Sequence, residues 1–285
     1  MISENKKVIM RDGVEIHTRI KEIGSPIWIV ATHGIGEHLE RHNYLVDLFS
    51  QNFNIFQYDL RGHGKSGGQR AWVEDFDHFR LDLHELLLFL QKEYRLKQYV
   101  LFGHSMGGLM TASFIQDIEN LFSSPERVFM CAPAGGFTGP LGPVIHNTPF
   151  SLWNKLADLK KSLKLGGLVD LNYLSHDVRV KDAYIHDSLN ELKLHSRLLF
   201  GMVSKSLEVF SKPLNSPCPT FCAYGSEDRI VNPDKLKQYF DEIDSSVNVK
   251  VIEGAFHEIH NEVDKYRSAY FDFLKKSIMD CLKEV

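Results

Sequence analysis

Short apolar segments alternate with segments of helical periodicity along most of this chain, and this alternation restricts the folds open to it. The apolar segments are residues 27–32, 53–58, 99–102, 128–132, 220–224 and 249–252. The segments with apolar residues every three or four positions are 43–51, 76–94, 107–120, 233–243 and 263–282. A helix between two strands carries the chain back to start the next strand in the same direction. The pattern therefore predicts an α/β fold, with a mostly parallel sheet and helices on both of its faces.

The N-terminal segment departs from this alternation. Residues 8–10 and 14–20 are apolar or alternating, and they flank the turn signal Asp12-Gly13. Two such runs joined by a short turn predict a β-hairpin.

The alternation also stops between residues 135 and 217, which show helical stretches and no good strand. Within this segment, 155–164 is predicted to be an amphipathic helix with a solvated lysine face. We therefore predict one core, formed by residues 1–134 and 218–285, and a helical cap inserted at 135–217. At the carboxyl ends of the strands, such a cap would cover the place where parallel sheets bind ligands.

The charge of the chain argues against nucleic acid as a partner. The formal net charge is −4, whereas phosphate binding requires a basic face. No apolar run approaches the roughly 18 residues that cross a bilayer, and the first seven residues lack the apolar core of a signal peptide. We therefore expect a cytoplasmic protein. The four cysteines show no metal-binding spacing, so we expect free thiols and no metal or other cofactor.

Ser105 is the first candidate for chemistry. Residues 103–107 fit the pattern G-x-S-x-G, directly after a predicted strand and directly before a predicted helix. A turn this tight strains the backbone of the serine, and small flanking residues relieve the crowding. The hydroxyl is then held at the top of the sheet, beside the positive end of a helix, which favours a developing oxyanion. These residues predict that Ser105 is a nucleophile.

A serine nucleophile needs a histidine base that a carboxylate orients. With this turn, the acid and then the histidine are expected in loops after later strands. Asp228 follows the strand predicted at 220–224, and His257 follows the strand predicted at 249–252. Glu227 is the rival acid. The spacing of His257 and His260 does not fit the zinc motif HExxH, which argues against a metal site.

An oxyanion needs two backbone N–H groups as well. One is expected from Met106, the residue after the nucleophile, and the other from Ile35 in the loop after the strand predicted at 27–32. Gly34 and Gly36 flank Ile35 and let the backbone approach a substrate closely.

Four motifs span nearly the whole chain outside the cap: HGIGEH at 33–38, DLRGHGKSGG at 59–68, GHSMGG at 103–108 and FHEIHNE at 256–262. Together they resemble the monoacylglycerol lipase and lysophospholipase group of α/β-hydrolases, of the S33 serine aminopeptidase type. The resemblance implies the α/β-hydrolase fold, with a lipid-facing helical cap over an apolar acyl tunnel. It also implies a polar pocket for a glycerol head group, formed by Glu37, Arg41 and His260. Ile35 stands where the group usually has alanine, and its bulkier side chain is expected to narrow the acyl entrance.

Two features keep simpler interpretations open. Glu37 and Arg41 are four residues apart, so they could form only an ion pair on a helix surface. The cap carries two apolar stripes, which either pack against the core or line an acyl channel and touch lipid. The stripes consist of Leu152, Trp153, Leu156, Leu159, Leu163 and Leu165, and of Leu192, Leu194, Leu198, Leu199, Met202, Val203 and Leu207.

The combined motifs predict a serine hydrolase of carboxylic esters that works through an acyl-enzyme on Ser105. Its expected partner is a small lipid ester, a monoacylglycerol or a lysophospholipid, with transient contact of the cap with a membrane surface. A peptidase, thioesterase or lactonase of the same fold is the alternative. A non-catalytic ligand-binding module would be expected to lose a member of the triad, and none is lost here.

Overall fold

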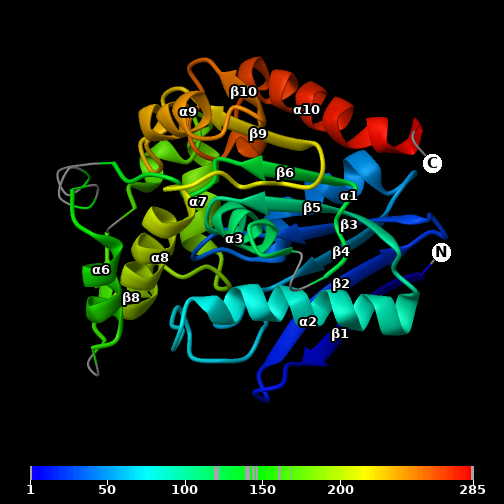
Figure 1. The fold of residues 1–285 in the computed structure, drawn as a ribbon, viewed down its shortest axis with the longest axis horizontal. Coiled ribbons are helices and arrows are strands. Elements are labelled where there is room, and N and C mark those ends of the chain that lie inside the picture. The colour runs from blue at the N-terminus through cyan, green and yellow to red at the C-terminus, as the bar shows by residue number, and fades with distance from the viewer. Residues whose placement is uncertain are drawn as a thin grey trace.

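The computed structural model describes residues 2–118, 122–138, 142, 145, 147–159, 162–167 and 169–283. These residues contain one large sheet of eight strands (Figure 1). In sheet order, the strands are β1 (Ile2–Ile9), β2 (Glu15–Glu22), β4 (Asn54–Tyr58), β3 (Ile27–Thr32), β5 (Gln98–His104), β6 (Arg127–Cys131), β9 (Thr220–Gly225) and β10 (Asn248–Ile252).

The strand directions confirm the predicted α/β architecture. β1 and β2 pair antiparallel, β2 pairs antiparallel with β4, and every other neighbouring pair in the large sheet is parallel. β3, β4 and β6 are buried at every position, as expected for parallel strands covered on both faces, whereas β2 alternates. The predicted hairpin is present, and β1 extends to Ile2 because all eight of its residues pair with β2.

Helices cover both faces of the sheet. α1 (Asn43–Phe49) and α10 (Asp264–Met279) pack in one apolar cluster, with Phe49 and Leu274 fully buried. α2 (Asp77–Tyr94), α3 (Met106–Ile115) and α9 (Pro233–Glu242) contribute to the other. The last two positions of the helix predicted at 107–120 lie outside the described residues. No helix in the described ranges is both long and apolar enough to cross a membrane.

The segment between β6 and β9, here called the insert, lies beside the carboxyl ends of the strands, at the left of Figure 1. Its described elements are α6 (Phe150–Ala157), β7 (Lys164–Gly166), η2 (Leu171–Tyr173), α7 (Val178–His186), β8 (Lys193–His195) and α8 (Ser196–Val209). The expectation of no strand in this segment is wrong, because β7 and β8 pair antiparallel. These strands have three residues each, which is too short to show a clear alternation.

The prediction of a helix at 155–164 is also wrong. α6 ends at Ala157, and Lys164 begins β7. Leu165 pairs with Leu194 across the small sheet, so the leucines here follow strand pairing and not helical spacing. Lys160 and Lys161 lie outside the described residues.

Hydrogen bonds join the insert to two loops of the core. Gly36 O, in the loop after β3, accepts from both Tyr184 Oη and Glu191 N at 2.8 Å. In the loop after β10, His257 N donates to Tyr173 O at 3.2 Å and Glu258 N donates to Leu174 O at 2.8 Å. The insert is therefore fixed to the same loops that carry the motifs.

Asp59, directly after β4, accepts hydrogen bonds from the segments after β3 and after β4. Its Oδ1 accepts from Leu39 N at 2.8 Å, at the start of the 3-10 helix η1 (Leu39–His42), and its Oδ2 accepts from Lys65 N at 2.7 Å. The side chain is buried. The motif DLRGHGKSGG at 59–68 therefore has a structural role, because its Asp59 holds the chain after β3 against the loop after β4.

We predict that Asp59→Ala destabilises the fold, because the backbone N–H groups of Leu39 and Lys65 lose a charged acceptor. The loss should be roughly 3 kcal/mol in the free energy of unfolding, which corresponds to a melting temperature about 6–12 °C lower. Differential scanning calorimetry measures it. Asp272→Ala, which removes an exposed carboxylate on α10, is the matched control and should melt like the wild type. Equal melting of the two variants would contradict the role of Asp59.

Candidate active site

Ser105 lies at the turn between β5 and α3, where its backbone has φ 53° and ψ −117°. A non-glycine residue with positive φ is strained, and here the turn is held by Ser105 N, which donates to Cys131 O at 2.9 Å. A Cβ on Gly107 would lie 2.4 Å from Thr32 O, and a Cβ on Gly103 would lie 2.4 Å from Gly107 O. Both positions therefore require glycine, and the predicted strand–serine–helix turn is present.

The three residues predicted as a triad form a chain of hydrogen bonds. His257 Nε2 lies 3.0 Å from Ser105 Oγ, and His257 Nδ1 lies 2.6 Å from Asp228 Oδ2. All three side chains are buried. Asp228 comes from the loop after β9 and His257 from the loop after β10, so distant segments meet at the carboxyl edge of the sheet.

Asp228, and not Glu227, is the carboxylate beside His257. Asp228 Oδ1 accepts from Ile230 N at 2.8 Å and from Val231 N at 2.9 Å, which fixes the carboxylate while Oδ2 faces the imidazole. Glu227 is exposed. Burial alone would lower the pKa of His257, but the charge and hydrogen bond of Asp228 outweigh it and raise the pKa above 6.5.

The two expected oxyanion donors belong to segments that meet near Ser105. Met106 is the first residue of α3, where a backbone N–H has no acceptor inside the helix. Ile35 lines the same pocket as Ser105. In the described part of the chain, neither backbone N–H donates a hydrogen bond. Both remain available to a ligand at Ser105.

Glu37 is the buried centre of a polar network beneath the nucleophile. Its Oε1 accepts from Gly34 N at 2.5 Å and lies 3.0 Å from both His42 Nε2 and His104 Nδ1. Burial would raise the pKa of Glu37, but the two imidazoles hold it well below its usual value. Glu37 is therefore ionised and fixes the loop that presents Ile35.

Arg41 is a buried partner of Glu37, so the alternative of a surface helix pair is wrong. Its Nε lies 3.2 Å from Glu37 Oε2, its Nη2 donates to Glu258 Oε2, and its guanidinium carbon lies 4.8 Å from the centre of the Tyr184 ring. The side chain is 10% exposed. Arg41 does not line the pocket.

His260 also lies behind the pocket wall. Its ring stacks on Tyr44 with centroids 4.9 Å apart and lies beside the rings of His42 and His104. Neither ring nitrogen has a hydrogen-bond partner among the described residues. Of the three predicted head-group residues, the structure places only Glu37 on the pocket wall.

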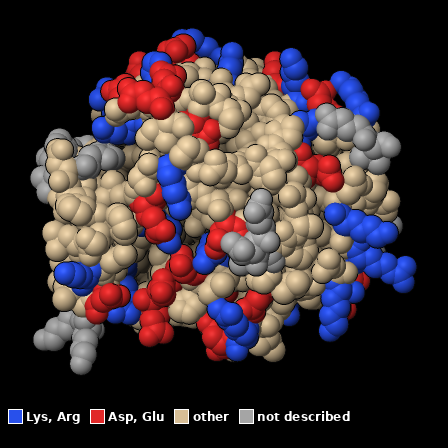
Figure 2. Space-filling view, viewed as in Figure 1, with Lys and Arg blue, Asp and Glu red and all other residues tan. Residues whose placement is uncertain are grey.

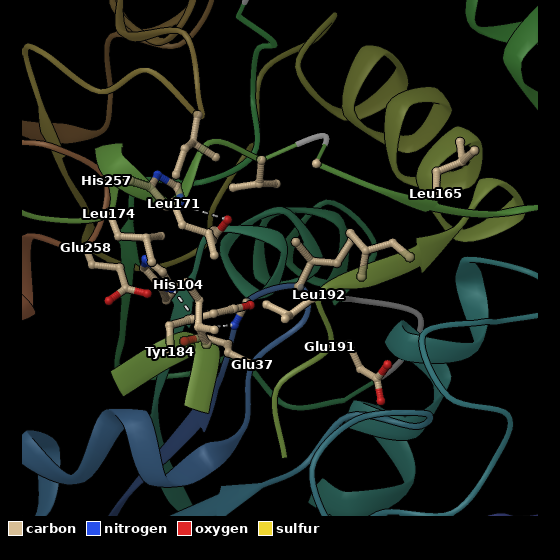
Figure 3. A pocket seen from close by; sticks show the side chains of 18 residues that line it. Glu37, His104, Leu165, Leu171, Leu174, Tyr184, Glu191, Leu192, His257 and Glu258 are labelled. Atoms are coloured by element: carbon tan, nitrogen blue, oxygen red, sulfur yellow. Dashed lines mark hydrogen bonds and ion pairs between the residues drawn. The ribbon is translucent and has the colours of Figure 1, made fainter. Parts of the chain in front are cut away.

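The pocket at Ser105 has a volume of about 260 Å³ and carries more polar side chains at one end than at the other (Figure 3). Glu37, Tyr184 and Glu258 lie at the end near His257, here called the polar end, where Leu171 and Leu174 also line the wall. Leu165 and Leu192, from the insert, lie towards the other end together with Glu191, whose carboxylate pairs with Arg70 and Lys164. A ligand with a polar group at the first end and an apolar chain along the leucines of the insert fits this arrangement.

Tyr184 and Glu258 are site residues that sequence reasoning missed. Glu258 directly follows the predicted base, and that adjacency is a signal that could have identified it. Tyr184 carries no such signal, because it lies on α7 in the insert and reaches Gly36 across 148 positions of sequence.

Two buried groups near Ser105 have donor atoms close enough together to consider a metal ion. They are Glu37, His42 and His104, and His104, Cys131 and His260. The first group is already occupied internally, since Glu37 Oε1 faces Gly34 N and both imidazoles. Burial raises the pKa of the Cys131 thiol to about 12, which disfavours the thiolate that would bind a metal in the second.

Comparison with known proteins supports the same assignment of fold. The family model described as serine aminopeptidase, S33, matches residues 27–264. The chain is similar to the monoglyceride lipase of Homo sapiens, with 28% identity over 93% of this chain and 86% of that protein. It is also similar to the monoacylglycerol lipase of Mycolicibacterium smegmatis, with 24% identity over 83% of each chain.

A solved structure of low sequence identity has a similar fold. A soluble variant of the monoglyceride lipase of Saccharomyces cerevisiae, in complex with a substrate analog, matches with a TM-score of 0.79 and 18% identity. The match covers 99% of this chain and 95% of that one. At this identity the likeness shows the fold, while the family model covers most of the chain. This protein is a member of the serine aminopeptidase, S33, family and has the α/β-hydrolase fold.

Proposed function

We propose that this protein is a serine hydrolase that cleaves carboxylic esters through an acyl-enzyme on Ser105. The observation that carries the proposal is the hydrogen-bonded chain from Ser105 through His257 to Asp228 at one wall of the pocket. A serine, a base and a buried orienting carboxylate in this order supply a nucleophile, a proton acceptor and a stabiliser of the imidazolium.

The reaction takes place in two steps. Ser105 Oγ attacks the ester carbonyl while His257 Nε2 accepts its proton, and the carbonyl electrons move onto an oxygen held by Ile35 N and Met106 N. The tetrahedral intermediate collapses, His257 protonates the departing alcohol, and an acyl-enzyme remains. Water, deprotonated by His257, then hydrolyses the acyl-enzyme and regenerates the serine. Asp228 holds the imidazole in the required tautomer throughout.

We propose a monoacylglycerol as the substrate, with a lysophospholipid as the second candidate. Two named relatives are monoacylglycerol lipases, and the pocket offers leucines of the insert to an acyl chain and a polar end to an alcohol. Ile35 lines the pocket, and we propose that its side chain narrows the entrance for the acyl chain. A peptidase activity remains the alternative, because it is what the family's description names.

The insert, as a cap over residues 135–217, is proposed to touch a membrane surface and deliver the lipid. Large apolar side chains are exposed on it, among them Phe150 at 43%, Leu152 at 47%, Leu159 at 53% and Leu163 at 68%. Figure 2 shows few charged side chains on the visible face over α6. Exposed apolar patches of this kind are typical of lipid- or protein-binding surfaces. A cytoplasmic location stays a prediction.

We predict that Ser105→Ala lowers the turnover of p-nitrophenyl esters and 1-monoacylglycerols by about 10⁴-fold or more, because the nucleophile is lost. A fluorophosphonate probe should label the wild type at Ser105 and leave the variant unlabelled, as measured by mass spectrometry. Ser113→Ala, further along the same helix, is the matched control and should label fully. A wild type that does not react with the probe would favour a non-catalytic binding module.

The raised pKa of His257 predicts the pH dependence of the reaction. Neutral imidazole is the active base, so kcat/KM should rise with pH along a limb above the ordinary histidine value of about 6.5. Asp228→Asn removes the charge that raises this pKa, so the limb should move to lower pH and the rate should fall by about 10⁴-fold. Stopped-flow or steady-state assays from pH 5 to 9 measure both effects.

Glu227→Gln is the control for the acid, since it changes the neighbouring exposed carboxylate. Its pH profile should match that of the wild type. The assignment of Asp228 is wrong if Glu227→Gln loses activity while Asp228→Asn keeps it.

We predict that the double substitution Leu152→Ser and Leu159→Ser weakens binding to phosphatidylcholine vesicles several-fold, because two exposed apolar side chains are lost from the insert. Vesicle co-sedimentation measures the binding. Leu88→Ser, which changes an exposed leucine of α2 at 43% exposure, is the control and should bind like the wild type. Equal binding of all three proteins would argue against contact through the insert.

A further inference from the structure

We infer that Glu258, the residue directly after the proposed base, makes the polar end of the pocket reject anionic head groups. The protein would then cleave esters of neutral or cationic alcohols and discriminate against substrates that carry a phosphate beside the ester. Of the two candidate substrates named above, this selects the monoacylglycerol over the lysophospholipid. This inference rests on the proposed ester hydrolase function and concerns the class of substrate that it accepts.

Carboxylates, and not cations, face the ligand at this end of the pocket. Glu37 and Glu258 both line it, together with Ser105 and His257 (Figure 3). Glu258 Oε2 accepts from Arg41 Nη2 and, at 2.7 Å, from Asn261 Nδ2. Glu258 Oε1 accepts no hydrogen bond from any residue that the structure describes. The pocket wall therefore carries an acceptor with no donor of its own.

Arg41 cannot take the place of a phosphate-binding cation here. It is not among the residues that line the pocket, and the ring of Tyr184 covers its guanidinium at 4.8 Å. Its Nε and Nη2 groups are directed at Glu37 and Glu258. The cation therefore neutralises one carboxylate from behind, while the surface that a head group meets remains acidic.

The formal charges of Glu37, Glu258 and Arg41 sum to −1, and Asp228 beside His257 adds a further negative charge. Glu37 and Glu258 contribute two negative charges and Arg41 one positive charge. Burial lowers the pKa of His104 and of His260, so these imidazoles are neutral and add no compensation. Burial raises the pKa of Tyr184, which keeps that phenol neutral too. A hydroxyl group can donate to the free oxygen of Glu258, whereas a phosphate offers only acceptors and like charge.

Three esters with the same medium-length acyl chain test the inference on the wild type: a 1-monoacylglycerol, the corresponding 1-acylglycerol 3-phosphate, and an acylcholine. The first two differ only by the phosphate, and the third carries a positive group of similar bulk. We expect kcat/KM for the phosphate ester to be about 100-fold below that for the monoacylglycerol, because of like-charge repulsion. The acylcholine should fall within about 10-fold of the monoacylglycerol, because its charge is opposite. Rejection of both charged esters would mean that size decides, and would overturn the inference.

Glu258→Gln tests the residue itself, because it removes one negative charge from the pocket wall. The ratio of kcat/KM for the phosphate ester to that for the monoacylglycerol should rise by roughly 10-fold or more. This ratio cancels general damage to the site, because both substrates share the same chemistry. Glu253→Gln, an exposed carboxylate five residues earlier, is the matched control and should keep the wild-type ratio. An unchanged ratio in folded Glu258→Gln would overturn the role of Glu258.

The outcomes separate this inference from the function on which it rests. Equal cleavage of all three esters by the wild type would keep the ester hydrolase and overturn the charge selection. Failure to cleave any of the three, or a p-nitrophenyl ester, would overturn the proposed function and the inference with it. If Glu258→Gln does not fold, the comparison of the three esters on the wild type decides the matter alone.

Discussion

The close approach of the turn at Ser105, between β5 and α3, to the end of β3 is the constraint on which the site depends. A single additional carbon on Gly107 would lie 2.4 Å from Thr32 O and 2.5 Å from His33 O. Because this space is kept empty, α3 begins directly beside the loop that carries Ile35. Ser105 and the two backbone N–H groups proposed to stabilise the oxyanion, those of Ile35 and Met106, are thus positioned by main-chain packing. Parallel strands β3 and β5, paired through six residues, make that packing rigid.

Buried charge is the second organising element. Glu37 is 2% exposed, yet it remains ionised because a backbone N–H, two imidazoles and a guanidinium surround it. An unpaired carboxylate at this depth would strongly destabilise the fold. The network therefore has to form as a unit, and it holds the loop after β3 in the one arrangement that satisfies all of its members.

The sequence predicted the fold class and the residues of the triad because each rests on local signals in a fixed order. Ser105 directly follows β5, and Asp228 and His257 lie in the loops after β9 and β10. Parallel strands bring their carboxyl ends to one edge of the sheet. The order of the strands in the sheet therefore brings the loops that carry the three side chains together, even though 152 positions separate Ser105 from His257. Asp228 could be separated from Glu227 only by structure, because the two are neighbours in the same loop.

The insert and the polar end of the pocket were predicted less well, for a physical reason. β7 and β8 are three residues long and are stabilised by pairing with each other across the insert, so their own sequences carry little periodicity. Arg41 and His260 have the expected residue types but lie behind the wall. The side chain that covers Arg41 is Tyr184, which comes from α7. Contacts between segments so far apart leave no local pattern to find.

The hydrogen bonds between the insert and the core have a thermodynamic consequence. Gly36, His257 and Glu258 all exchange backbone hydrogen bonds with the insert, so displacing the insert must disturb the loops on either side of Ser105. A partner whose binding to the outer surface displaced the insert would therefore also change the affinity of the pocket for its ligand. By linkage the coupling is reciprocal, so a ligand that orders the pocket changes the affinity of the outer surface by the same factor. The backbone hydrogen bonds of the insert are the route by which such a displacement would reach the loops beside Ser105.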